Sequence, residues 1–243
     1  AGAMGAMGLL FTYLLSRQGG SDIWLLDIHP EREETIRKDG LFVEGVSGDH
    51  HVHPQITVKP ENIGEADLVI LCVKSTDTYE AARNATPLVG ADTGVLTLQN
   101  GLGNIESIEQ ALGPGRALGG TTSMGATVLA PNRVRHAGWG ETIIGERAGK
   151  KTERAEAILE TFRLAGLDVS FTDNLPGLLW SKLIINVGIN ALTALTRIHN
   201  GRLIDHEGTR TVMKMAVEEA AQVARALGIR LLYDRPVEKG AGV

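Results

Sequence analysis

The sequence predicts an α/β protein in which a doubly wound parallel sheet is followed by an all-helical domain. Over the first 173 residues, short apolar runs suited to strands alternate with helical runs, which is the pattern of βα units around a parallel sheet. From Asn174 onward, two long helical runs follow without a convincing strand. A chain of 243 residues is long enough for two modest domains. We therefore predict domains at 1–173 and 174–243.

The elements follow in chain order from hydrophobic period and turn residues. The first half is expected to hold a helix at 5–17, a strand at 23–28, a short helix at 31–38, and strands at 41–44 and 56–59. The run at 67–73 is almost continuously apolar, as expected for a strand buried on both faces. A helix at 78–85 and a strand at 94–99 follow, and then a helix at 105–112 for which Asn104 is the expected cap.

The second half begins with strands at 117–127 and 141–144. The run at 152–165 is an amphipathic helix, because Ile158, Leu159 and Phe162 share one face. A last strand is expected at 168–171. Long helices at 175–195 and 208–227 then make up the second domain.

Composition argues against several classes of partner. The chain has 24 basic and 29 acidic residues, a formal net charge of -5 and a pI near 5.8, so nothing favours nucleic acid or an anionic membrane. The most apolar segment is interrupted by Lys182 and two asparagines, so no membrane span is expected. The start lacks the features of a signal peptide, and the single cysteine, Cys72, lies in an apolar run. These observations predict a cytoplasmic protein with a buried thiol.

The chain opens with a glycine turn. Gly2 and Gly5 fit the second and third glycines of the dinucleotide motif G-x-G-x-x-G, and the first would lie just before Ala1. With Ala3 and Met4 between them, these glycines would let the backbone approach a pyrophosphate at a helix N-terminus. The turn therefore predicts binding of a dinucleotide.

Three polar residues lie at the ends of predicted strands, where open α/β sheets bind ligands. Asp27 follows the strand after the glycine turn, where a carboxylate would bind the ribose hydroxyls of NAD; the alternative is a turn residue before His29. Lys74 could meet a cofactor phosphate or a substrate carboxylate, or be a solvated loop lysine. Asn100 lies in a glycine-rich loop whose backbone and side chains could turn toward a ligand.

The most informative feature is a polar stripe on an apolar helix. Lys182, Asn186 and Asn190 are four residues apart, so they lie on one side of a helix made largely of Leu, Ile, Val and Ala. Burying an unpaired lysine is costly, which leaves two interpretations. One is a structural ion pair with asparagines that bond neighbouring helices. The other, which we favour, is a catalytic lysine flanked by amides that hold a small polar substrate.

Together these segments resemble the ketopantoate reductase (2-dehydropantoate 2-reductase) family. The resemblance covers essentially the whole chain: the glycine turn, Val73-Lys74, Leu-Gln-Asn-Gly-Leu-Gly at 98–103, Leu-Trp-Ser-Lys-Leu at 179–183, Asn-Ala-Leu-Thr-Ala at 190–194 and Asn-Gly at 200–201. The segments at 98–103 and from 179 to 201 are quite specific to that family.

The resemblance implies a Rossmann domain joined to a helical domain, with NADPH reducing ketopantoate to pantoate on the way to pantothenate and coenzyme A. Lys182 is then similar to the family's general acid, and Asn100 to an asparagine that positions cofactor and substrate. Asn186, Asn190 and Asn200 match positions that hold the substrate, and Lys74 matches a cofactor-side lysine. The resemblance is also compatible with a homodimer.

Two departures from the family pattern carry expectations. NADP-dependent members place a basic residue after the second strand, whereas this chain has Asp27, which would repel a 2′-phosphate and argues for NAD, although Arg32 could approach. Members also have a first strand before the glycine turn and further helices after Val243. We therefore expect this 243-residue stretch on its own to be poorly folded or inactive.

Other readings of the sequence remain open. His50, His51 and His53 have no acidic or cysteine partner at ligand spacing, so a surface hairpin is expected and no metal site. An NAD-dependent dehydrogenase of other branched 2-keto or 2-hydroxy acids is an alternative within the same chemistry. A dinucleotide-sensing module without catalysis is an alternative of another class, although such a module would need only the glycine turn.

Overall fold

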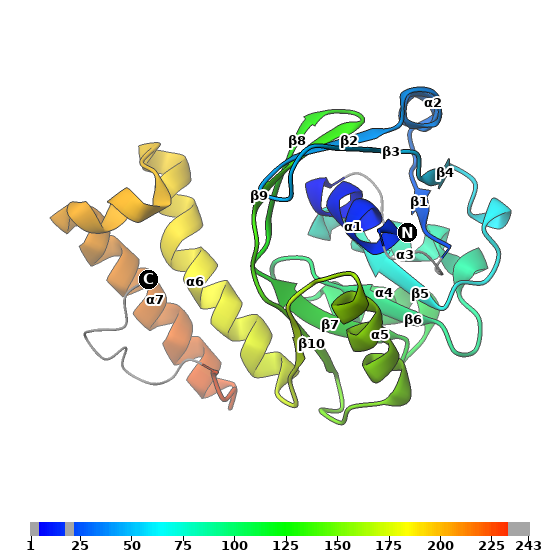
Figure 1. Ribbon diagram of the computed structural model, residues 1–243. Coiled ribbons are helices and arrows are strands. Elements are labelled where there is room, and N and C mark those ends of the chain that lie inside the picture. The colour runs from blue at the N-terminus through cyan, green and yellow to red at the C-terminus, as the bar shows by residue number, and fades with distance from the viewer. Residues whose placement is uncertain (1–4, 18–21, 233–243) are drawn as a thin grey trace. The chain divides into compact units, whose positions relative to one another are not determined.

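A computed structural model describes residues 5–17 and 22–232 of the chain (Figure 1). The chain forms two compact units, Ala1–Leu175 and Pro176–Val243. The first is the α/β part and the second is helical, as the sequence predicts.

The main sheet of the first unit has five strands in the order β11-β10-β7-β6-β5. They are β5 (Leu68–Leu71), β6 (Gly94–Thr97), β7 (Ala117–Thr122), β10 (Thr142–Glu146) and β11 (Val169–Phe171). Neighbouring strands are parallel, except that β10 is antiparallel to β7. β5 and β6 are almost wholly buried, which explains their continuous apolar sequences.

Two smaller sheets complete this unit. β1 (Trp24–Leu26) pairs in parallel with β4 (Gln55–Thr57). A four-stranded sheet has the order β3-β2-β9-β8, formed by β2 (Leu41–Gly45), β3 (His50–Val52), β8 (Gly125–Ala130) and β9 (Arg133–Gly138). Figure 1 shows this second sheet curving over the helix α1 (Ala6–Ser16). Residues 8–15 of that helix are all buried.

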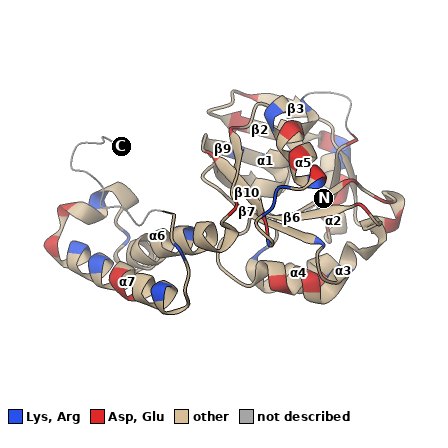
Figure 2. Cartoon of the chain, turned by 90° about the horizontal axis from the view of Figure 1, so that it is seen from below, with Lys and Arg blue, Asp and Glu red and all other residues tan. Residues whose placement is uncertain are grey.

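The other helices of the first unit carry acidic and basic residues (Figure 2). They are α2 (Pro30–Asp39), α3 (Thr78–Asn84), α4 (Asn104–Leu112) and α5 (Glu153–Leu164), with short 3₁₀ turns η1 (Pro60–Asn62), η2 (Ser75–Asp77) and η3 (Thr86–Leu88). Leu9, Leu14, Leu96 and Phe162 from α1, β6 and α5 belong to the hydrophobic core. The core therefore lies between the sheets and these helices.

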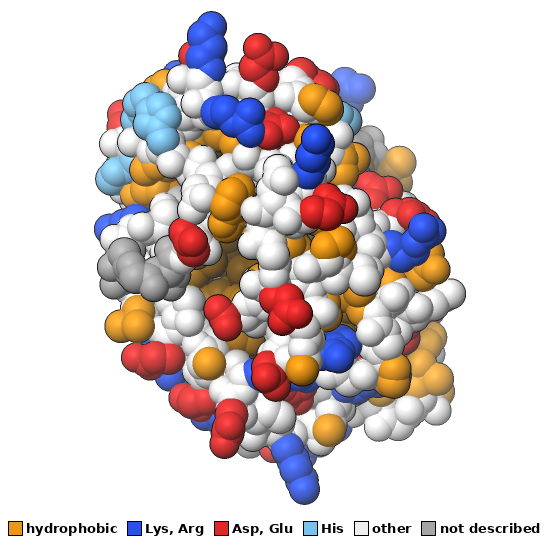
Figure 3. Space-filling model, turned by 90° about the vertical axis from the view of Figure 1, so that its right-hand side faces the viewer, with side chains coloured by type: hydrophobic (Ala, Val, Ile, Leu, Met, Phe, Trp, Pro, Cys, Tyr) orange, Lys and Arg blue, Asp and Glu red, His pale blue; other side chains and the backbone are white. Residues whose placement is uncertain are grey.

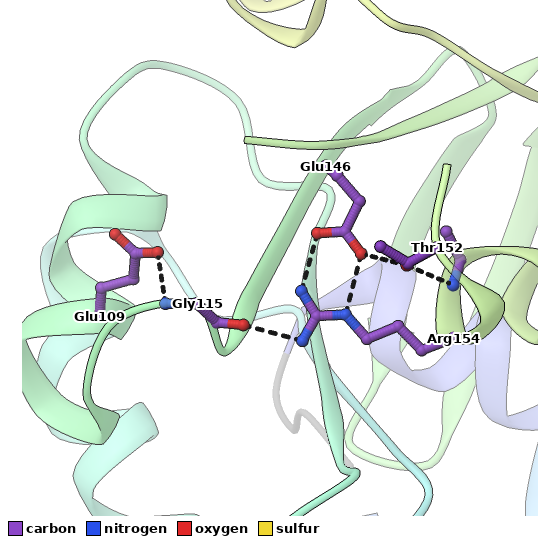
Figure 4. Close-up of polar contacts among 6 residues, drawn as sticks. Glu109, Gly115, Glu146, Thr152 and Arg154 are labelled. Carbon is purple, nitrogen blue, oxygen red and sulfur yellow. Dashed lines mark hydrogen bonds and ion pairs between the residues drawn. The ribbon is translucent and has the colours of Figure 1, made fainter. Parts of the chain in front are cut away.

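A polar network ties the start of α5 to the end of β10 (Figure 4). Arg154 donates two hydrogen bonds to the Glu146 carboxylate, at 2.8 and 2.7 Å, and a third to the carbonyl of Gly115 at 2.8 Å. The Thr152 hydroxyl donates to Glu146 at 2.6 Å and accepts from the Ala155 amide as the N-cap of the helix. Burial raises the pKa of Glu146, but the hydrogen bonds from Arg154 and Thr152 outweigh it and hold that pKa below its ordinary value.

Three details differ from the sequence prediction. The predicted strand at 117–127 is two strands, β7 and β8, and β9 was not predicted. Asn104 is not the cap of α4: Gly103 occupies the N-cap with a φ of 86°, which a glycine adopts without strain. The Asn104 side chain is instead buried, where it accepts from the Thr78 hydroxyl at 3.1 Å.

The histidine segment forms the predicted hairpin, in which β3 pairs antiparallel with β2. His51 stacks on Phe42 with ring centroids 4.1 Å apart, and His50 stacks on Tyr13 at 4.8 Å. Within residues 5–17 and 22–232, no group of three His, Cys, Asp or Glu side chains is placed to hold a metal ion.

The helical unit consists mainly of α6 (Leu175–Thr196) and α7 (Glu207–Ala226), joined through the 3₁₀ turn η4 (Asn200–Asp205). The two helices pack closely at Gly188, where a Cβ atom would lie 2.8 Å from Val217. By length and composition α6 could cross a membrane, with a mean hydropathy of 1.5 over its most apolar window, but core helices of soluble proteins also meet this test. Its 22 residues carry Lys182, Asn186 and Asn190.

Candidate active site

The loops that follow β5 and β6 are tied together by the side chain of Gln99. Its amide nitrogen donates to the carbonyl of Val73 at 2.7 Å and to the hydroxyl of Thr78 at 2.9 Å. Its amide oxygen accepts from Thr97 at 2.8 Å. One side chain therefore fixes both loops at the carboxyl edge of the parallel strands, where this class of sheet binds ligands.

Lys74 and Asn100 lie in these two loops. Both are exposed, and the Ser75 hydroxyl donates to the carbonyl of Asn100 at 2.9 Å, which joins the two loops a second time. Gly101 and Gly103 have φ values of 91° and 86°, and a Cβ atom on either would meet nothing within 4 Å. Glycine is therefore favoured at both positions because of the backbone conformation and not because a side chain would lack space.

Gly5 is the part of the glycine turn that the structure describes, because Gly2, Ala3 and Met4 lie outside the described residues. It is the N-cap of α1, and within the described part of the chain no side chain caps that helix end. A Cβ atom on Gly5 would lie 2.6 Å from the carbonyl oxygen of Cys72, at the end of β5. Gly5 thus allows the close approach of helix and strand that the glycine motif requires.

Asp27 follows β1, as predicted, but its carboxylate is completely buried. Oδ1 accepts from the backbone amides of Ile28 and His29, at 2.6 and 2.8 Å. Oδ2 lies 3.5 Å from Nη1 of Arg32, whose side chain is only 15% exposed. The carboxylate therefore shapes the turn before α2 and faces the neighbouring guanidinium.

The polar stripe lies on α6. Lys182 and Asn186 are half-buried and Asn190 is exposed. In the part of the chain that the structure describes, no carboxylate forms an ion pair with Lys182. Ser181, next to it, is buried and accepts from the amide of Leu232 at 3.0 Å. Among the residues that the structure describes, no side chain of the helical unit forms an ion pair with Lys182.

Asn200 begins η4 and is exposed. Just before it, Arg197 has a positive φ of 58°. Its amide donates to the carbonyl of Thr193 at 2.9 Å, which closes the end of α6.

The structure thus forms two groups of candidate residues. Lys74, Asn100 and the start of α1 belong to the α/β unit, and Lys182, Asn186, Asn190 and Asn200 to the helical unit. Sequence reasoning missed the positioning role of Gln99. Its signal was present, as an amide directly after a buried strand.

Family models and individual relatives of this chain all point to the same protein family. The family model described as "Ketopantoate reductase PanE/ApbA" matches residues 2–149, and the model "Ketopantoate reductase PanE/ApbA C terminal" matches residues 174–241. A 2-dehydropantoate 2-reductase of Halobacterium salinarum is 38% identical over 226 residues, which are 93% of this chain and 74% of the relative. One of Pyrococcus horikoshii is 36% identical, over 93% of this chain and 73% of the relative.

Solved structures agree with these relatives. The crystal structure of a 2-dehydropantoate 2-reductase from Geobacter metallireducens is similar with a TM-score of 0.88 and 33% identity, over 96% of this chain and 77% of that one. A ternary structure of D-mandelate dehydrogenase with NADH and anilino(oxo)acetate also reaches a TM-score of 0.88, at 26% identity, over 95% of this chain and 74% of that one.

Proposed function

We propose that this chain, which belongs to the ketopantoate reductase family, uses Lys182 as the acid in the reduction of ketopantoate to pantoate. The activity is that of a 2-dehydropantoate 2-reductase, an NAD(P)-dependent step of pantothenate biosynthesis. This activity is favoured over the reduction of other branched keto acids and over a sensing role.

The observation that carries the role of Lys182 is its position on α6. The lysine is half-buried on an apolar helix and no described carboxylate neutralises it. A structural ion pair with a described residue of the helical unit therefore has no support. A partly desolvated ammonium without a partner is suited to meet negative charge that develops on a substrate.

The reduction of a ketone requires a group that stabilises negative charge on the oxygen and donates a proton to it. A nicotinamide dinucleotide, when bound, supplies the hydride that reduces the C2 ketone. The ketone oxygen gains negative charge as its carbon is reduced, and the Lys182 ammonium stabilises that charge and donates the proton that makes the alcohol. The neutral amine then regains a proton from water, so one ketone, one hydride and one proton are consumed for each alcohol formed.

The asparagines supply recognition in this proposal. Asn186, one turn beyond Lys182, and Asn190, one turn further, present amides along the same side of α6. An amide both donates and accepts, so it can bind a carboxylate or a hydroxyl of the substrate. Asn200, the first residue of η4, adds a third amide.

The residues at the start of α1 and in the loops after β5 and β6 are suited to binding a dinucleotide. No side chain of the described residues caps the start of α1, so its backbone amides are suited to a pyrophosphate, and the backbone of Cys72 leaves no room for a side chain at Gly5. We assign Gly2, Ala3, Met4 and Gly5 to the pyrophosphate. Lys74 would face the cofactor phosphates, and Asn100 would position the nicotinamide.

We propose that NADH is the preferred form, through Asp27. A 2′-phosphate beside that carboxylate would meet a negative charge, and Arg32 already faces the same carboxylate at 3.5 Å. The similar D-mandelate dehydrogenase structures contain NADH. Asp27→Asn should release Arg32 and shift the ratio of kcat/KM for NADPH over NADH upward, by roughly ten-fold. A strong preference of the unmodified enzyme for NADPH would refute this assignment.

The substrate is tested with the full-length protein and two keto acids that differ by one hydroxyl, ketopantoate and 3,3-dimethyl-2-oxobutanoate. We expect kcat/KM to be larger for ketopantoate by at least about 100-fold, because a site built to bind a hydroxyl rejects the analogue that lacks it. Asn186→Ala and Asn190→Ala should reduce this ratio, while Gln222→Ala, an exposed amide on α7, should leave it unchanged. Equal rates with both keto acids would favour a different branched substrate.

A further inference from the structure

Asn104, the first residue of α4, links the loop after β6 to the first residue of α3. Its amide oxygen accepts from the Thr78 hydroxyl at 3.1 Å, and its amide nitrogen donates to the carbonyl of Asn100 at 3.3 Å. Asn104 and Thr78 are 5% and 0% exposed. A buried amide is expected to use both of its ends in hydrogen bonds, and here one of the two partners is the proposed nicotinamide-binding residue.

Hydrogen bonds lead from β6 to this loop in one direction. The Thr97 hydroxyl donates to the amide oxygen of Gln99 at 2.8 Å, and the amide nitrogen of Gln99 donates to Thr78 at 2.9 Å. Thr78 then donates to Asn104, and Asn104 donates to Asn100. Successive hydrogen bonds of this kind polarise and strengthen one another. We call Thr97, Gln99, Thr78 and Asn104 the amide network.

The amide network allows one orientation of the Asn104 side chain. With its nitrogen and oxygen exchanged, the oxygen would lie against the carbonyl oxygen of Asn100, and neither atom carries a hydrogen to donate. The nitrogen would lie against the Thr78 hydroxyl, which already receives a hydrogen bond from Gln99. Gln99 therefore determines, through Thr78, that Asn104 offers a donor to Asn100.

The carbonyl of Asn100 accepts a second hydrogen bond. The Ser75 hydroxyl, in the loop after β5, donates to the same oxygen at 2.9 Å. A carbonyl oxygen has two lone pairs, so the two donors use its full capacity and fix the plane of the peptide that follows Asn100. This peptide needs to be fixed, because the next residue is Gly101, with a φ of 91°, and glycine has the greatest backbone freedom.

Burial makes the hydrogen bonds of the amide network costly to lose. Thr97 is 4% exposed and, like Thr78 and Asn104, has little contact with solvent. A cavity of about 1030 Å³ in the α/β unit is lined in part by α1, β5 and α5, and none of the four network residues lines it. Figure 3 shows hydrophobic side chains inside a hollow on one side of the molecule. A network group whose partner is removed is therefore left unpaired.

We propose that Asn104 is a positioning residue of the reductase, which acts through Asn100. This inference rests on the proposed function, in which Asn100 positions the nicotinamide. Asn104 fixes the backbone from which the Asn100 side chain extends, and Thr78 and Gln99 orient Asn104. A displacement of about 1 Å at a reacting group lowers the rate by roughly 100-fold, so the loss of Asn104 slows hydride transfer more than it weakens nucleotide binding.

Single-turnover kinetics of the full-length protein test this inference. Asn104→Ala removes the donor to Asn100. Ser107→Ala is the matched control, because the Ser107 hydroxyl donates at 2.9 Å from the same helix to the carbonyl of Gly103 in the same loop. For Asn104→Ala we expect the rate of ketopantoate reduction at saturating reduced nucleotide to fall by about 10- to 100-fold, with the Kd of the nucleotide changed less than about three-fold. Ser107→Ala should retain the rate within about two-fold.

A double-mutant cycle with Asn100 separates positioning from a structural role. Because Asn104 acts through the Asn100 side chain, Asn104→Ala should slow the Asn100→Ala protein by no more than about two-fold. A structural role would slow the unmodified protein and the Asn100→Ala protein by the same factor, and that result would overturn the proposal.

Two variants of Thr78 keep the inference testable if Asn104→Ala does not unfold cooperatively in urea. Thr78→Val removes the hydroxyl and keeps the shape of the side chain, whereas Thr78→Ser keeps the hydroxyl. We expect Thr78→Val to slow the reaction by about five-fold or more, and Thr78→Ser to slow it by less than about two-fold. Equal rates for these two variants would also overturn the proposal.

Hydrogen exchange distinguishes a failure of this inference from a failure of the proposed function. The backbone amides of residues 98–103 should exchange about ten-fold faster in Asn104→Ala than in the unmodified protein, whichever keto acid is the substrate. Unchanged exchange would overturn the inference while the reductase activity stands. An unmodified protein that does not reduce ketopantoate would refute the proposed function, and the exchange measurement would still decide whether Asn104 holds the loop.

Discussion

Replacing Gly5 by alanine tests whether the glycine turn is required by close packing. The φ and ψ of Gly5, -87° and 157°, are accessible to any residue, so the substitution introduces no backbone strain. The added methyl would lie 2.6 Å from the carbonyl oxygen of Cys72, well inside van der Waals contact. Since that oxygen belongs to the backbone at the end of β5, it can move only if helix and strand separate.

The expected cost combines two effects. Forcing a methyl into a filled space costs about 1–3 kcal/mol. Alanine is also a poorer N-cap than glycine, which adds roughly 0.5–1 kcal/mol. We therefore expect the free energy of unfolding to fall by about 1.5–4 kcal/mol, and nucleotide affinity to fall with it because the start of α1 is displaced.

Urea denaturation and nucleotide titration measure the two consequences. Gly138→Ala is the matched control, since Gly138 lies in β9, and a Cβ atom there would meet nothing within 4 Å. It should change the free energy of unfolding by no more than about 0.5 kcal/mol. If Gly5→Ala unfolds at the same urea concentration as the unmodified protein, the inference that α1 and β5 pack too closely for a side chain at position 5 is refuted.

Further predictions concern the polar networks. Arg154→Ala removes two hydrogen bonds to the largely buried Glu146 and one to Gly115, and should lower the free energy of unfolding by about 2–3 kcal/mol in a urea melt. The pKa of Glu146 is held below its ordinary value of 4.5, so its contribution to the free energy of unfolding is present above pH 4.5 and is lost as the pH falls further. Glu146→Gln should therefore weaken the loss of stability on acidification. An unchanged loss would contradict the assignment. Gln99→Leu should raise KM for the nucleotide more than it lowers kcat, because it releases the loop at Val73; an unchanged KM would show that the loops need no such tie.

The buried strands and long helices could be predicted because their signals are local. The apolar run at 67–73 contains β5, and α6 ends one residue beyond the predicted helix, where Arg197 adopts a positive φ. β9 was missed although Val134 and His136 alternate with exposed arginines. Its pattern of period two is short, and the partner strands β2 and β8 that stabilise it are distant in sequence or separated by a turn.

The sequence predicted which residues belong to the candidate site better than it predicted the contacts that their side chains make. The stripe of Lys182 and its two asparagines follows from helical spacing alone. The surroundings of Asp27 do not, because they depend on the turn into α2 and on the guanidinium of Arg32. The same holds for Asn104, whose side chain bonds Thr78 across two helices instead of capping its own.

The central claim is that Lys182 donates the proton to the reduced ketone, and a single-turnover measurement tests it most directly. Full-length protein saturated with reduced nucleotide is mixed with ketopantoate, and the loss of nicotinamide absorbance is followed for the unmodified protein, Lys182→Ala and the control Lys214→Ala, an exposed lysine on α7. For Lys182→Ala we expect the rate to fall by about 100- to 10,000-fold, with nucleotide affinity unchanged and partial rescue by added ethylammonium. A Lys182→Ala protein that reduces ketopantoate within a few-fold of the unmodified rate would contradict the account.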